Sequence, residues 1–155
     1  MIRRRAGFTF IELLIVMIVL GLLAGLAILK YIDLTHRARA AQAAGDLEAV
    51  RIAAYGSWYE NGKWPAEVAA GVIPPGLAAY LPRGFTFSRN EYTLDWENFS
   101  PPNGGQTAGM QVGVVVSSTD PRLQRALENA LGNKLPFVDV GGTLTFIIVG
   151  PDGNN

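Results

Sequence analysis

The chain has 155 residues, with one histidine, no cysteine, and thirteen basic residues against thirteen acidic ones. One domain is expected at this length. The missing cysteines exclude a disulfide scaffold, a thiolate zinc site and a cysteine nucleophile, and the zero formal charge argues against a general polyanion or nucleic-acid binder. Hydrophobic residues make up 49% and charged residues 17% of the chain, which directs attention to a membrane segment.

The first thirty residues combine a basic leader with a long apolar run. Arginines occupy positions 3–5, and residues 13–29 carry no charge and include only two glycines outside the hydrophobic class. At about 1.5 Å of rise per residue this run covers about 26 Å of helix, and residues 8–11 extend it to the thickness of a bilayer. The basic flank predicts a single membrane pass with its N-terminus in the cytoplasm and the rest of the chain outside.

Two simpler interpretations of this segment are a secretory signal peptide and a plain single-pass anchor. The run is longer than the apolar region of a usual signal peptide, and no clear small-residue cleavage site precedes the charged segment 30–33. Residues 24–27 could serve as such a site, but a cut there would leave Ile28 and Leu29 near the new terminus. A plain anchor remains open on these grounds.

Glu12 favours a third interpretation. A carboxylate between two apolar segments is costly to place in lipid, and such residues usually have a partner and a function. Residues 5–16, which read RAGFTFIELLIV, closely resemble the N-terminal signature of type IV prepilins. That family also includes the pseudopilins of type II secretion and the DNA-uptake pseudopili. A basic leader, glycine, aromatic residue, threonine, glutamate and long apolar run make this signature highly specific.

The resemblance implies how the N-terminus is processed and used. A membrane aspartyl peptidase, the prepilin peptidase, would cut after Gly7, and the new terminal residue, Phe8, would be N-methylated. Glu12 would then meet the terminal amine of Phe8 on a neighbouring subunit as a filament grows. The physics agrees, because pairing two charges that both lie in hydrocarbon removes a penalty that each would suffer alone.

The expected function is that of a structural subunit, with no enzymatic activity and no cofactor. It would polymerise through its N-terminal helix into a type IV pilus or a type II secretion pseudopilus, on an inner-membrane platform with a cytoplasmic ATPase. The alternative is a low-abundance minor pilin that acts at a filament tip in recognition or DNA uptake. The expected domains are a leader peptide (1–7), a transmembrane and polymerisation half-helix (8–30) and an exported domain (31–155), placed first in the inner membrane and then in a periplasmic or cell-surface filament.

The helix is expected to continue from Phe8 to about Glu60, because alanine is frequent and proline is absent before Pro65. Its wetter face would include Asp46, and Asn61-Gly62 would supply a left-handed cap. Gly21 and Gly25 form a small-xxx-small pair that permits close helix contact. Many pilins carry a kinking proline near Leu29-Lys30, which this chain lacks. We therefore assign helix flexibility and packing to the two glycines as a hypothesis.

Beyond Pro65, turn signals separate short alternating segments. Strands are predicted at residues 85–88, 92–97, 110–116 and 143–149, with 89–91 as a hairpin link. Asp120-Pro121 would open a short helix with a stripe of leucines (Leu123, Leu127 and Leu131), and Gly132 would end it. The fold class is therefore α+β: a long protruding N-terminal helix packed on a small antiparallel sheet of about four strands, with one additional short helix, as in the pilin globular domain.

The exported part holds three weak candidates for chemistry. His36 has no second imidazole nearby in sequence and is interpreted as solvated or in a subunit contact. Glu91, Asp95 and Glu97, with Asn98, could offer oxygen ligands to calcium, although the spacing is not an EF-hand and a solvated strand face is favoured. Basic and aromatic residues alternate in the segment that contains Arg83, Phe85, Phe87, Arg89, Tyr92 and Trp96. Packing of the aromatic rings is favoured there over nucleic-acid contact.

Overall fold

The computed structural model describes residues 7–99, 111–132, 136–140 and 143–150. Its elements in chain order are α1 (Phe10–Asn61), α2 (Pro75–Ala78), β1 (Thr93–Asn98), β2 (Val112–Ser117), α3 (Pro121–Leu131), β3 (Phe137–Val140) and β4 (Thr143–Val149). The chain divides into two compact units, one up to Thr35 and one from His36 onward.

Helix α1 has 52 residues and confirms the long helix expected from Phe8 to about Glu60. Gly62 follows it with a φ of 66°, and its N–H donates to the carbonyl of Trp58 at 2.8 Å, as predicted for a left-handed cap. The buried residues of α1 all lie in the second unit and follow helical spacing: Ala40, Ala43, Asp46, Leu47, Val50, Ala53, Ala54 and Ser57.

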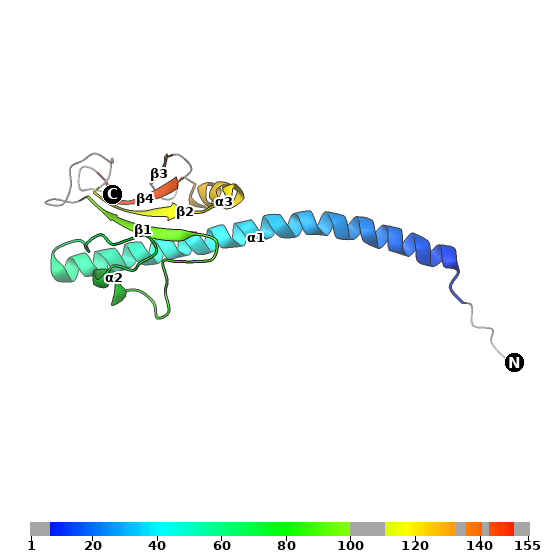
Figure 1. The fold of residues 1–155 in the computed structure, drawn as a ribbon, viewed down its shortest axis with the longest axis horizontal. Helices are drawn as coiled ribbons and strands as arrows, with labels where there is room; N and C mark the ends of the chain where they lie inside the picture. The colour runs from blue at the N-terminus through cyan, green and yellow to red at the C-terminus, as the bar shows by residue number, and fades with distance from the viewer. Residues whose placement is uncertain (1–6, 100–110, 133–135, 141–142, 151–155) are drawn as a thin grey trace. The chain divides into compact units, whose positions relative to one another are not determined.

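The four strands form one antiparallel sheet in the order β1-β2-β4-β3. One transverse row joins Trp96, Val114, Phe146 and Phe137, one from each strand. Within the second unit, the later part of α1 lies along this sheet (Figure 1). Leucines of α3, alternate residues of the strands and the buried apolar residues of α1 form one hydrophobic core. Burial of this core is the main driving force for folding of the unit.

Polar contacts hold β1 to the chain that follows α1. The indole Nε1 of Trp96 and the amide Nδ2 of Asn98 both donate to the carbonyl of Pro65, at 3.0 and 2.7 Å. The outer edge of β1 is also paired at Leu94, which donates to Phe87 and accepts from Gly71. The two bonds of Leu94 pair backbone groups that an edge strand would otherwise leave open.

The predicted short helix is confirmed as α3. The carboxylate of Asp120 accepts from the backbone N–H of Arg122 at 2.9 Å, and Gly132 ends the helix with a φ of 48°. An N-cap carboxylate satisfies a backbone donor that would otherwise have no partner. Leu123, Leu127 and Leu131 are buried, as their spacing predicted.

Three strands are confirmed within one or two residues of their predicted bounds, but the strand predicted at 85–88 is wrong. That segment makes only an isolated bridge between Ser88 and Thr93. The hydroxyl of Thr86 donates to the carbonyl of Ser88 and accepts from its N–H, so the segment closes a local turn in place of a ladder. The fourth strand is β3, which the sequence did not indicate. Met110, at the start of the predicted second strand, lies outside the described residues.

The turn signal at Pro74-Pro75-Gly76 contains a short helix, α2. Pro75 occupies its first position, where a missing N–H does no harm. Leu77 projects from this turn into the core and is fully buried. The segment after α1 therefore contributes to the core in addition to connecting α1 with β1.

Candidate functional site

The segment that would be cut and modified lies ahead of α1. Gly7, Phe8 and Thr9 precede the first helical residue and lie outside regular secondary structure. The Phe8 side chain is 80% exposed, and nothing lies within 4 Å of the position of a Cβ on Gly7. Within the described residues, nothing therefore covers Gly7 or the Phe8 side chain.

Thr9 and Glu12 form a capping box at the start of α1. The backbone N–H and the hydroxyl of Thr9 both donate to Oε2 of Glu12, each at 2.8 Å. The backbone N–H of Glu12 donates in turn to the Thr9 hydroxyl at 3.3 Å. This reciprocal pattern satisfies donors that the first turn of a helix otherwise leaves unpaired. The N-terminal signature includes Thr9, but its pairing with Glu12 was not predicted, although a threonine three residues before a glutamate is the signature of this box.

The apolar part of α1 is exposed along its whole length in the described part of the chain. Every residue from Gly7 to Tyr31 is exposed, including Leu13, Met17 and Leu22. By length and composition this helix could cross a membrane. A continuous apolar surface of this extent marks a lipid-facing or protein-facing interface.

Gly21 and Gly25 lie within this exposed part of α1, and the helix is continuous through both. A Cβ at either position would meet no atom within 4 Å. No described residue therefore requires glycine at these two positions, which leaves close contact with another helix as the packing role that the small-xxx-small pattern predicts. The flexibility assigned to the two glycines stays a prediction.

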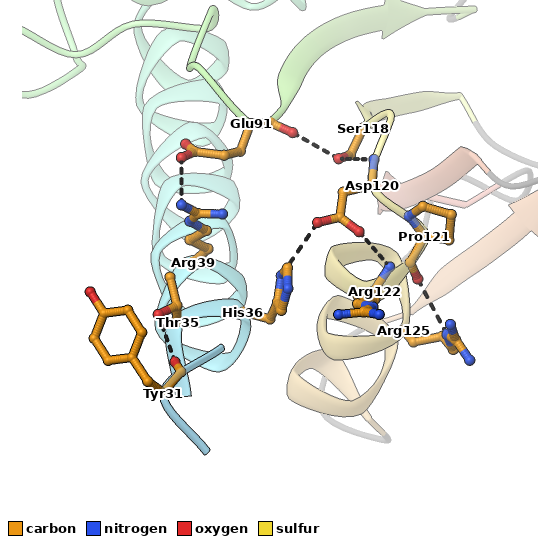
Figure 2. Close-up of polar contacts among 10 residues, drawn as sticks. All are labelled: Tyr31, Thr35, His36, Arg39, Glu91, Ser118, Asp120, Pro121, Arg122 and Arg125. Carbon is orange, nitrogen blue, oxygen red and sulfur yellow. Dashed lines mark hydrogen bonds and ion pairs between the residues drawn. The ribbon is translucent and has the colours of Figure 1, made fainter. Parts of the chain in front are cut away.

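His36 lies against the N-terminus of α3 (Figure 2). Its Nδ1 is 3.5 Å from Oδ2 of Asp120, and its side chain is 14% exposed. Of the two positions predicted for His36, the solvated one is wrong, because α3 covers this imidazole. The subunit contact stays a prediction. Beside it, Arg39 pairs with Glu91 at 3.1 Å, and the carbonyl of Glu91 accepts from the Ser118 hydroxyl at 2.7 Å. These contacts fasten the turn before β1 and the start of α3 to α1.

Asp46 is buried against an arginine and a tyrosine from the chain before β1. Its carboxylate accepts from Nε and Nη2 of Arg89 at 3.0 and 3.1 Å and from the Tyr92 hydroxyl at 2.6 Å. The hydrogen bonds from Arg89 to Asp46 raise the pKa of Arg89. Burial, followed by the hydrogen bond from its own hydroxyl to Asp46, raises the pKa of Tyr92. The prediction that Asp46 lies on the wetter face of α1 is wrong. Arg89, 43 positions away in sequence, covers this side chain.

Of the six residues considered for nucleic-acid contact, five make contacts inside the domain, and Arg83 is exposed. Phe87 and Trp96 are fully buried, Tyr92 is 3% exposed, and Arg89 is paired with Asp46. Phe85 and Phe87 meet edge to face with ring centroids 6.0 Å apart. These contacts confirm the favoured interpretation, in which the aromatic rings pack together, and leave no exposed stacking platform among these five residues.

The calcium candidates do not converge. Glu91 pairs with Arg39, and Asn98 is buried with its amide on Pro65. Asp95 and Glu97 lie on one face of β1, where burial first and then the charge of Glu67 raise the pKa of each carboxyl. In the described part of the chain, no group of three or more His, Cys, Asp or Glu residues is placed to hold a metal ion.

Comparisons with known proteins address the N-terminal part of the chain. Residues 2–28 match the family model described as the prokaryotic N-terminal methylation motif. Two type IV major pilin proteins PilE1 of Neisseria gonorrhoeae are each 40% identical to the chain over 70 residues, which is 44% of this chain and 42% or 39% of theirs. The match thus spans less than half the length of these curated relatives. No solved structure matches the chain.

Proposed function

We propose, from the type IV pilin family that these matches support, that the chain is a structural subunit of a type IV pilus. The subunit is cut between Gly7 and Phe8 by a prepilin peptidase and N-methylated at Phe8. It then polymerises through the N-terminal half of α1. The relatives named above are major pilins, which favours a pilus over a secretion pseudopilus and a major subunit over a tip protein.

The observation that carries the proposal is the contrast between a fully exposed apolar helix and a single carboxylate at its start. Every residue from Gly7 to Tyr31 is exposed in the single chain, so this surface needs lipid or other copies of the helix. A plain anchor is served by apolar residues alone and has no use for a charge at Glu12. A polymer of such helices, in which each Glu12 meets a neighbouring terminal amine, accounts for both features.

The proposed pathway begins in the membrane. The basic leader (1–7) stays in the cytoplasm, residues 8–30 span the inner membrane, and residues 31–155 lie outside. After the cut, an assembly platform driven by a cytoplasmic ATPase would move the subunit from lipid into a filament. The apolar helix then exchanges lipid contacts for contacts with its copies, where Gly21 and Gly25 permit close approach.

The test is assembly by the full chain in cells that hold the peptidase and the platform. Sheared filaments are collected and the subunit in them is measured. Gly7→Ala should stay uncut and absent from filaments, whereas Glu12→Ala should be cut and methylated but fail to assemble. Gly45→Ala and Glu48→Ala are matched controls, since Gly45 has open space around it and Glu48 pairs only on the helix surface with Arg51. Normal assembly by the Glu12→Ala variant would contradict the proposal.

A further inference from the structure

Thr9 holds the Glu12 carboxylate through one of its two oxygens. The Thr9 backbone N–H and hydroxyl both reach Oε2, at 2.8 Å each. In the part of the chain that the structure describes, Oε1 accepts no hydrogen bond. One oxygen of the carboxylate is therefore fixed on its own chain while the other is open to a second donor.

This arrangement prepares the carboxylate for binding. A carboxylate offers about four acceptor positions on its two oxygens, so Oε1 can accept from an incoming amine while both bonds to Oε2 persist. A glutamate side chain that is free to rotate loses conformational entropy when it is fixed. Because Thr9 has already fixed the Glu12 side chain, the incoming subunit does not bear that loss.

Thr9 also acts before any partner arrives. An ionised carboxylate within a lipid-facing segment is unfavourable unless donors solvate it. The Thr9 N–H and hydroxyl supply two such donors from the same chain, and the first turn of α1 gains its cap from the same contacts. The subunit can thus keep Glu12 charged before it assembles with a neighbouring subunit.

We propose that Thr9 is a positioning residue for filament assembly, which anchors Oε2 of Glu12 and presents Oε1 to the terminal amine of a neighbouring subunit. The amine keeps its proton and no covalent bond changes. This inference rests on the proposed function and adds to it a residue that acts through Glu12. It requires the Thr9–Glu12 contact to survive assembly.

The first test replaces the Thr9 hydroxyl. Thr9→Val keeps the shape and removes the hydroxyl, and Thr9→Ser restores it. Thr35→Val is the matched control on the same helix, because the Thr35 hydroxyl donates only to the carbonyl of Tyr31 within its own turn. Assembly is measured as the fraction of cut, methylated subunits that enter sheared filaments, so an effect on processing cannot imitate an effect on assembly.

We expect Thr9→Val to lower that fraction about tenfold, as the loss of a hydrogen bond to a charged group would. Thr9→Ser and Thr35→Val should stay within about twofold of wild type, a margin small against that loss. Normal assembly by Thr9→Val, equal defects in Thr9→Val and Thr9→Ser, or an equal defect in Thr35→Val would each overturn the inference. A defect in Glu12→Ala beside normal assembly of Thr9→Val would overturn this inference alone and leave the proposed function standing.

The second test examines wild-type filaments and does not depend on any variant. Solid-state NMR would measure the dipolar coupling between threonine amide ¹⁵N and glutamate ¹³Cδ in labelled filaments. A retained short Thr9–Glu12 contact is expected. Its loss on assembly would show that the neighbouring amine displaces Thr9, which contradicts simultaneous binding.

Discussion

The two parts of α1 differ in what surrounds them. From Phe10 to Thr35 the helix has no buried residue, whereas from Ala40 to Ser57 one face is buried under the sheet and the segment before β1. The exposed part is built from large apolar side chains, and the buried face is built mainly from alanine with Leu47 and Val50. One continuous helix therefore has two kinds of surroundings. The domain of its own chain covers the later part, whereas the earlier part needs lipid or other protein molecules around it.

Removal of a large apolar side chain should distinguish the buried part of α1 from the exposed part most clearly. Leu47→Ala should lower the free energy of unfolding of the domain by about 3 kcal/mol, because it leaves a cavity in the core. Leu22→Ala, in the exposed part, should change that free energy by less than about 0.5 kcal/mol. Denaturant unfolding of the full chain in detergent, followed by tryptophan fluorescence, measures both. Equal losses would show that the exposed part has partners within the chain.

The one buried charge of α1 gives the next largest effect. Asp46→Ala removes the acceptor of Arg89 and Tyr92 and should cost about 2 kcal/mol of unfolding free energy, less than a fully buried pair because Arg89 is 28% exposed. Glu48→Ala, whose partner Arg51 lies on the surface, should cost a few tenths of a kcal/mol. The same unfolding assay separates them, and similar values for the two would contradict a structural role for Asp46.

His36, the first residue of the second unit, contacts Asp120 at the start of α3. Asp120→Ala removes the N-cap of α3 and the carboxylate beside His36, and should cost about 1 kcal/mol. Asp120→Asn keeps an acceptor for the N–H of Arg122 and should recover most of that loss. Hydrogen exchange of the α3 amides would locate the effect. A loss in the Asn variant as large as in the Ala variant would assign the effect to the charge beside His36.

The smallest expected effect depends on pH and lies on β1. Since folding raises the pKa values of Asp95 and Glu97, the folded state binds more protons than the unfolded state, and these carboxylates destabilise the fold at neutral pH. That contribution should fade as the pH falls below about 4. Glu67→Gln should therefore stabilise the domain by a few tenths of a kcal/mol at pH 7 and not at pH 3.5. A gain that is equal at both pH values would exclude repulsion as its cause.

Local signals in the sequence were sufficient for the elements that they directly control. The cap at Gly62, the α3 bounds at Asp120 and Gly132, and the alternation in β4 each depend on neighbours within a few residues. The contacts of Asp46 with Arg89 and Tyr92 join residues 43 and 46 positions apart, which no local pattern encodes. The exchange of the predicted strand 85–88 for β3 has the same origin, because strand pairing is settled by long-range packing.

The most direct measurement is the mass of the N-terminal peptide of the mature protein. We expect a chain that begins at Phe8 and carries one additional methyl group on its terminal amine, with residues 1–7 removed and the apolar helix retained. A chain that keeps Met1, or one that begins near Ala27, would contradict it, because the exposed half of α1 would then belong to a plain anchor or a discarded signal peptide.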